Sequence, residues 1–430
     1  MKKKIAQLKE HPSYDKVLHW GKLISITGSA QIIVQALGFV CGILIIRLLP
    51  VQEYALYTLA NTMLGTMTVL SDGGISTGVM AQGGKVWQDK EKLGVVLATG
   101  LDLRRKFAIG SLLVSVPILF YLLIHNNASW LTAVLITAAL IPAFYAALSD
   151  SLLEIVPKLH QSILPLQKNQ VAVGTGRLVL TALTMFVFPW AFIAVLAAGL
   201  PRIIGNFQLR KISYGFADNS QQPDKEVRVE ILALVKRIMP TSIYYCVAGQ
   251  ITIWLISIFG NTTSVAQLGA LGRLSVLLSL LSVIVATLVV PRYAKLPSSK
   301  HLLLVRFIQI MGLLIIFLSI IIVLVYLFPT PILWILGDAY KGLPFELLLS
   351  VTGSCIALLS GISYSLYSSR GWAMPPFILI TFNLLTVIGL ASIIDLSSLK
   401  GVLFLNIGIS FIAFLQTSLF CTYKIIRIKK

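Results

Sequence analysis

Three arginines, Arg177, Arg202 and Arg273, stand inside long apolar stretches and are the strongest candidates for a chemical role. If these stretches are membrane-spanning helices, the arginines lie roughly 13–18 Å from an interface at 1.5 Å per residue. A guanidinium at that depth is costly, so it usually faces a cavity or a partner. No acidic residue lies at that depth in the same stretches, and the guanidinium fork suits phosphate. The pattern predicts a cationic cavity that binds an anionic ligand.

A structural role is the alternative for each arginine. The long side chain can extend toward an interface, or it can hydrogen-bond a backbone carbonyl and fix helix packing. For a single arginine the two interpretations are balanced. For the three together, a shared cavity explains the pattern better.

Two residues between positions 53 and 82 are weaker candidates. Asp72, which precedes Gly73 and Gly74, is the only acidic residue well inside a predicted span. It could bind a proton or a cation, pair with an arginine, or cap a helix that breaks at the double glycine, and pairing or capping is favoured. Asn61 is a candidate for the cavity wall, although an interhelical hydrogen bond is the favoured interpretation.

Most other chemistries lack the residues that they need. Lys236 and Arg237 stand at the cytoplasmic start of the predicted span 229–258, where they could form a vestibule. The four cysteines lie in different apolar stretches and no histidine stands at metal-ligand spacing, so we expect no metal site. The sequence has no Walker A motif, no Ser/His/Asp spacing and no paired-carboxylate site. We therefore expect a transporter rather than an enzyme, without a cofactor; coupling to H⁺ or Na⁺ stays open.

The composition identifies the elements that position these residues. Hydrophobic residues make up 57% of the 430 and charged residues only 12%, against roughly 25% charged in a soluble domain. A bilayer core needs about 20 residues of helix to cross, and apolar stretches of that size recur along the chain. We predict an all-α integral membrane protein of about twelve spans: 23–49, 53–82, 93–124, 130–151, 168–188, 190–209, 229–258, 264–290, 300–328, 344–367, 373–394 and 398–423.

The basic residues predict the orientation of these spans. Of the 35 Lys and Arg, 29 fall in alternate segments at one side, three in the opposite loops and three inside spans. Cytoplasmic loops carry an excess of Lys and Arg, so both termini are expected in the cytoplasm. Because the positive charge lies between spans and not on one soluble face, nucleic acid is not an expected partner.

The one long hydrophilic stretch divides the chain into two bundles of six helices. The predicted parts are a cytoplasmic segment 1–22, a bundle 23–212, a linker 213–228, a second bundle 229–423 and a basic tail 424–430. A weak similarity at an offset of 212 residues suggests a parallel repeat, in which Asn61 corresponds to Arg273. Two related bundles predict a cavity between the halves.

Several short motifs resemble one family. They are Ile45–Tyr57 at the first turn, Asp72-Gly73-Gly74, Val290-Pro291-Arg292 and Ile335–Tyr340. Together with the span number and topology, they resemble the polysaccharide and O-antigen flippases of the multidrug/oligosaccharidyl-lipid/polysaccharide exporter superfamily. The sequence departs from the family pattern at Ala55, where glycine is usual, and around Gly269–Gly272, where a tyrosine is often found.

The resemblance implies a function in a bacterial cytoplasmic membrane. Its members move an undecaprenyl-diphosphate-linked oligosaccharide to the outer leaflet by alternating access, among membrane lipids and with a polysaccharide polymerase and a chain-length regulator as potential partners. The three arginines would then hold the diphosphate. Two alternatives stay open: a cation-coupled multidrug exporter of the same superfamily, which would want acidic residues in the cavity, and a non-transporting component of a glycan-assembly complex.

Overall fold

The computed structural model describes residues 12–428 except positions 295, 298, 371 and 373, and helix is the regular secondary structure of this part of the chain. Nine of the described helices are long and apolar enough to cross a membrane. The prediction of an all-helical, multi-pass membrane protein is therefore confirmed. The first eleven residues of the predicted segment 1–22 and the last two of the tail 424–430 lie outside the described residues.

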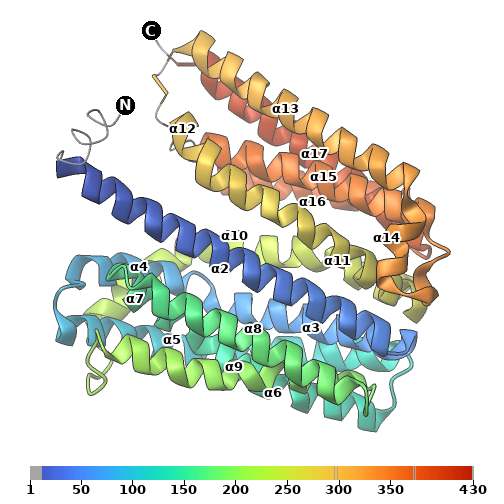
Figure 1. Ribbon diagram of the computed structural model, residues 1–430, viewed down its shortest axis with the longest axis horizontal. Helices are drawn as coiled ribbons and strands as arrows, with labels where there is room; N and C mark the ends of the chain where they lie inside the picture. Colours follow the sequence, from blue (N-terminus) through green and yellow to red (C-terminus); the bar gives the residue numbers. More distant parts are fainter. Residues whose placement is uncertain (1–11, 295, 298, 371, 373, 429–430) are drawn as a thin grey trace, which may run out of the picture.

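The first half forms one group of long helices (Figure 1). Its helix α2 begins at Pro12, well before the predicted start at position 23. A helix can continue into water beyond its apolar part, which alone is visible to hydropathy. The elements are α2 (Pro12–Leu48), α3 (Val51–Asp72), α4 (Ile75–Val86), α5 (Lys90–His125), α6 (Trp130–Leu153), α7 (Ile155–Leu159), α8 (Ile163–Met185) and α9 (Ala191–Tyr214).

The second half forms a second group, drawn from yellow-green to red in Figure 1. Its helices are α10 (Lys225–Phe259), α11 (Thr262–Ile284), the π-helix η1 (Val285–Val289), α12 (Val290–Ala294), α13 (Lys300–Leu327), α14 (Pro329–Leu336), the 3₁₀ turn η2 (Asp338–Tyr340), α15 (Pro344–Ser368), α16 (Pro376–Ala391) and α17 (Leu399–Ile426). The start of α2 and the end of α17 lie at one end of the molecule. We call this the terminal end and the opposite one the far end.

The predicted span 53–82 is two helices, α3 and α4, which meet at Gly73 and Gly74. Both glycines have positive φ angles, 50° and 99°, which residues with a side chain rarely adopt. The Asp72 carboxylate accepts from the backbone N–H of Ser76 at 3.1 Å and of Gly74 at 3.4 Å, so it satisfies two of the free donors at the start of α4. Of the roles considered for Asp72, helix capping is confirmed.

The linker after α9 packs against the first half. The backbone N–H of Asp218 donates to the carbonyl of Lys90 at 3.0 Å, and that of Asp224 donates to the Thr99 hydroxyl at 2.9 Å. Ala217, Ile231 and Val235 are buried in a hydrophobic cluster of first-half residues. The linker and the first turns of α10 therefore belong to the core of the first half. The boundaries 213–228 between domains stay a prediction.

Two glycines of α5 give a matched test of this packing. A Cβ atom at position 94 would lie 2.4 Å from the carbonyl oxygen of Asp218, whereas one at position 110 would meet no atom within 4 Å. We expect Gly94→Ala to destabilise the protein by about 1–3 kcal/mol, because the linker must move. Gly110→Ala is expected to be neutral or stabilising by up to about 1 kcal/mol. Unfolding temperatures in detergent measure both; equal values for the two variants would contradict the close contact.

Candidate functional site

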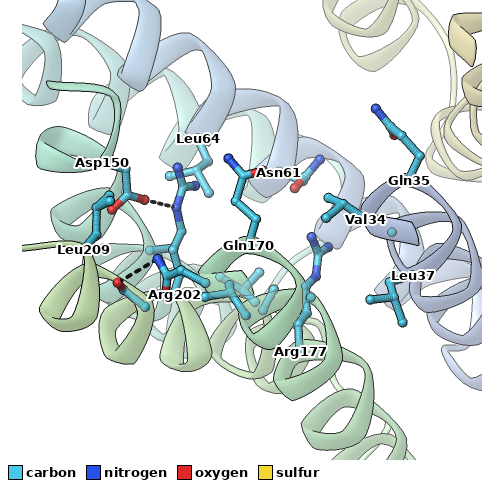
Figure 2. A pocket seen from close by; sticks show the side chains of 18 of the residues that line it. Val34, Gln35, Leu37, Asn61, Leu64, Asp150, Gln170, Arg177, Arg202 and Leu209 are labelled. Atoms are coloured by element: carbon cyan, nitrogen blue, oxygen red, sulfur yellow. Dashed lines mark hydrogen bonds and ion pairs between the residues drawn. The ribbon is translucent and has the colours of Figure 1, made fainter. Parts of the chain in front are cut away.

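A cavity of about 440 Å³ lies inside the first half, among α2, α3, α6, α8 and α9. Arg177 of α8, Arg202 of α9 and Asn61 of α3 line it (Figure 2). Two of the three predicted arginines thus share one cavity. Arg273 is not among its lining residues, and the cavity is within the first bundle, where the sequence predicted one between the bundles.

Arg202 is paired with a carboxylate. Its Nε donates to the Asp150 carboxylate at 2.7 Å, and the side chains are 39% and 19% exposed. Asn206, one turn after Arg202, donates to the other Asp150 oxygen at 2.6 Å. The stretch that carries Arg202 offered no acidic residue at its depth, and the partner comes from a different helix. Asp150 comes from α6, and only the packing of α6 on α9 brings the two side chains together.

Arg177 has a different environment. Its guanidinium donates to the Tyr57 hydroxyl at 3.4 Å, a long hydrogen bond, and its Nε is buried without a partner among the described residues. No ion pair of Arg177 with a described carboxylate is found. Figure 2 shows the guanidinium pointing from α8 toward α2 and α3. Arg177 is half-buried, and a cation in this position that is held by one long hydrogen bond favours an anionic ligand group.

Arg273 reaches from α11 of the second half onto the first half. Its side chain packs over Gly42, where a Cβ atom would lie 3.4 Å from the Arg273 Cδ. It interacts with Tyr54 and Tyr57, and it lies near enough to Arg177 for the two positive charges to repel each other. Tyr57 therefore interacts with both arginines. The absence of a side chain at Gly42 lets the Arg273 side chain lie close to the backbone of α2.

Asp72 forms a separate charged cluster toward the terminal end. Its carboxylate lies 3.2 Å from Nη1 of Arg104, whose side chain is 4% exposed. The same nitrogen donates to the hydroxyl of Ser76 at 3.2 Å and to that of Ser151. A second cavity, of about 470 Å³, borders this cluster and also reaches Asp150 and Arg202. Asp72 pairs with an arginine, as considered, but with Arg104 and not with one of the three.

The other predicted residues are Asn61, Lys236 and Arg237. Asn61 is exposed toward the cavity. Lys236 and Arg237 have exposed side chains on α10, and their role as a vestibule stays a prediction. A cavity of about 610 Å³ does lie between the halves, among α3, α10 and α15, but Gly65, Thr68, Ser242 and other uncharged residues line it.

Two acidic residues of the cavity wall were missed. Asp150 and Glu154 both line the cavity with Arg177 and Arg202. They stand four residues apart, which places them on one face of a helix, and Glu154 lies just beyond the predicted span 130–151. Two acidic residues with this spacing at the end of an apolar stretch could have indicated an acidic wall of a cavity. Gln170 of α8 donates to the Glu154 carboxylate at 3.1 Å, so the acidic pair is tied to the helix that carries Arg177.

Comparison with known proteins finds likeness in structure alone. No protein-family model and no curated protein sequence matches the chain. A multidrug-resistance MATE family transporter of the MOP superfamily, solved in an inward-facing conformation, matches with a TM-score of 0.72 at 14% identity, over 91% of this chain and 94% of that one. An outward-facing MATE structure gives 0.61 at 16% identity, over 95% and 96%.

A third structure is of a different kind. A MOP superfamily transporter from Pyrococcus furiosus, described as having a binding pocket of reverse polarity that suggests a different function, gives a TM-score of 0.65 at 16% identity, over 95% of this chain and 96% of that one. Fold and site together define a multi-pass, all-helical membrane protein with a charged internal cavity. Its fold is that of the MATE transporters of the MOP superfamily.

Proposed function

We propose that the protein exports small organic molecules by alternating access, coupled to the entry of a cation. The observation that carries this proposal is the charged cavity of about 440 Å³ inside a fold shared with MATE transporters. That volume is in the range of small-molecule sites, roughly 300–1,000 Å³. Asp150 and Glu154 supply the acidic residues that an exporter of this kind was expected to need. This favours the exporter over the flippase predicted from the motifs.

The proposal includes an arrangement in the membrane. With α3, α8 and α16 added to the nine apolar helices, the chain would have twelve spans, six in each half. The excess of basic residues in the loops of the terminal end supports a cytoplasmic location for that end. The protein would lie in a bacterial cytoplasmic membrane, and the two halves would rock about the central cavities.

The test is export from proteoliposomes. Purified protein would be reconstituted into vesicles that contain ethidium, a cation, or rhodamine B, a zwitterion, and a proton or sodium gradient would be imposed. We expect gradient-dependent loss of dye from vesicles with the protein and none from empty vesicles. Retention of both dyes under both gradients would overturn the proposal.

A second candidate function is the flipping of a lipid-linked oligosaccharide. One specific observation favours it: Arg177 and Arg273 lie near each other without a described carboxylate partner, an arrangement suited to a diphosphate. In this case the lipid tail would stay in the bilayer and the sugar would enter the cavity between the halves. Cells without the protein would then accumulate lipid-linked oligosaccharide, and the dyes would stay in the vesicles.

Contacts at the far end support an inward-facing arrangement. Arg47 at the end of α2 donates through Nε to the carbonyl of Ile335 at 2.9 Å and lies over the Trp334 ring at 4.7 Å. Asn126 donates to the Ser257 hydroxyl at 2.8 Å, again joining the two halves. The higher TM-score with the inward-facing structure agrees with a closed far end.

Removal of the Arg47 contacts is expected to favour opening of the far end. Each net hydrogen bond contributes about 1 kcal/mol, so Arg47→Gln should raise the outward-open population about fivefold. Spin labels at Asn127→Cys and Asp395→Cys, in far-end turns of the two halves, would report a larger fraction of long distances. The matched control is Lys341→Gln, which removes a far-end cation that pairs within its own turn. An unchanged distance distribution in Arg47→Gln would show that these contacts do not hold the far end closed.

A further inference from the structure

The formal charges of the residues that line the first-half cavity sum to zero. Its lining includes four charged residues: Asp150, Glu154, Arg177 and Arg202. Asp150 and Arg202 neutralise each other through their contact at 2.7 Å. Glu154 and Arg177 are the other two charged residues of the lining. Glu154 pairs with Lys158 at 2.6 Å across one helical turn, but Lys158 is half-exposed and outside the cavity, so solvent screens this pair. Glu154 is therefore taken as the negative pole of the cavity and Arg177 as the positive pole.

The two poles are separated along α8. Gln170 holds the Glu154 carboxylate at 3.1 Å, and Arg177 follows Gln170 by seven residues on the same helix. Seven residues make two helical turns. The side chains of Gln170 and Arg177 therefore share a face of α8, and their Cα atoms differ by roughly 10 Å along the helix axis. Figure 2 shows Gln170 and Asn61 between the Asp150–Arg202 pair and Arg177. The cavity is thus an elongated site with a negative and a positive end.

Polar groups between and beside the poles lack partners in the described part of the chain. The Arg177 Nε and the Asn169 Oδ1 are both buried without a hydrogen bond. Asn169 and Arg177 line the same cavity. Buried polar groups are rarely left unsatisfied in proteins. The Nε of Arg177 is enclosed, but the side chain lines the cavity, so an anionic group there would compensate the charge of the guanidinium.

We propose that the substrate of this cavity is a zwitterion whose cationic group lies at Glu154 and whose anionic group lies at Arg177, roughly 10 Å apart along two helical turns. This inference rests on the proposed export function and names the substrate class. A neutral dipolar molecule matches the zero net charge of the lining, whereas a simple cation or anion leaves one pole uncompensated. The amides between the poles suit a substrate with hydrogen-bonding groups along its length.

Triglycine is the probe for this arrangement. An extended chain spans at most about 3.3–3.6 Å per residue, so its ammonium and carboxylate lie roughly 10 Å apart. N-acetyl-triglycine keeps only the negative charge and triglycine amide keeps only the positive one. The charged ends of glycine are too close together to reach both poles, and those of extended hexaglycine are too far apart. Isothermal titration calorimetry with the full chain in an uncharged maltoside detergent would compare their affinities.

We expect triglycine to bind at least about tenfold more tightly than either blocked form, because each removes one charge-assisted contact. Glu154→Gln removes the partner of the ammonium group, so this variant should bind triglycine and N-acetyl-triglycine equally well. Arg177→Gln removes the partner of the carboxylate, so this variant should bind triglycine and triglycine amide equally well. The matched controls are Glu91→Gln and Lys168→Gln, which remove exposed charges from α5 and α8 outside the cavity. Both control variants should still bind triglycine more tightly than either blocked peptide.

The outcomes separate this inference from the proposed function. Equal affinity for the three peptides, or the same loss of selectivity in both cavity variants, would overturn the zwitterion site. If dye export from vesicles persists in that case, the exporter stands and only its substrate class is wrong. Selective binding of triglycine without export of any probe would support the site and overturn the transport function.

Discussion

Replacement of Arg177 by glutamate is expected to lower the export of rhodamine B by about 100-fold. The change removes a cation that faces the cavity, and truncating one partner of a buried charged contact costs about 2–5 kcal/mol; about 2.7 kcal/mol corresponds to 100-fold. The new carboxylate would lie near Arg273. The repulsion between Arg177 and Arg273 would thus be replaced by an attraction between the glutamate and Arg273. The variant is therefore expected to fold, and initial export rates in proteoliposomes measure the effect.

The control for this prediction is on the same helix. Lys168→Glu makes the same charge change at an exposed position of α8 that does not line the cavity. Its export rate is expected to stay within about twofold of the original, since a surface charge contributes little. Normal export by Arg177→Glu, with an unchanged unfolding temperature, would contradict a substrate-binding role for Arg177. An equal loss in both variants would point to a general charge effect.

The candidate site could be predicted from the sequence only in part. Arg177 and Arg202 were found because an arginine in an apolar stretch is conspicuous, and the structure places them in one cavity. The Asp150 partner of Arg202 was missed. A helix that is apolar on nearly all sides carries no polar face that fixes its rotation in the sequence, so the contact between α6 and α9 depends on packing that hydropathy does not report.

The ends of the helices show a second limit. The predicted span 229–258 becomes α10, which begins at Lys225. The Asp224 side chain accepts from the backbone N–H groups of Glu226 at 2.8 Å and Val227 at 3.0 Å. Helix starts in water are set by such caps, whereas hydropathy marks only the apolar length. The cap residue was present in the sequence and is a better signal for this start than the apolar run.

The position of the charged cavity could not be predicted from the sequence. Two similar halves predict a cavity between them, and one of about 610 Å³ is present, but its lining is uncharged. The charged cavity is inside the first half because α8 and α9 turn their arginines toward α3 and α6. The number of intramembrane charges is visible in a sequence, while the direction in which they point is set by helix packing.

Arg104 is expected to make the largest contribution of a single charged side chain to folding stability. It is 4% exposed, pairs with Asp72 at 3.2 Å and donates to Ser76 at 3.2 Å. Arg104→Met would leave the Asp72 carboxylate without its counter-ion next to the break between α3 and α4. Breaking a buried pair in this way costs about 3–5 kcal/mol; with Asp72 27% exposed to solvent, we expect about 3 kcal/mol.

A double variant separates the orphaned charge from the lost packing. In Asp72→Asn with Arg104→Met no carboxylate is left unpaired at position 72, and the asparagine oxygen can still cap α4, so we expect at least half of the lost stability to return. Arg105→Met, at the neighbouring exposed position, is the control and should change stability by less than about 0.5 kcal/mol. Unfolding in detergent, followed by tryptophan fluorescence, gives all three values. A double variant as unstable as Arg104→Met would show that the Arg104 side chain acts through packing and its serine contacts, and not by neutralising Asp72.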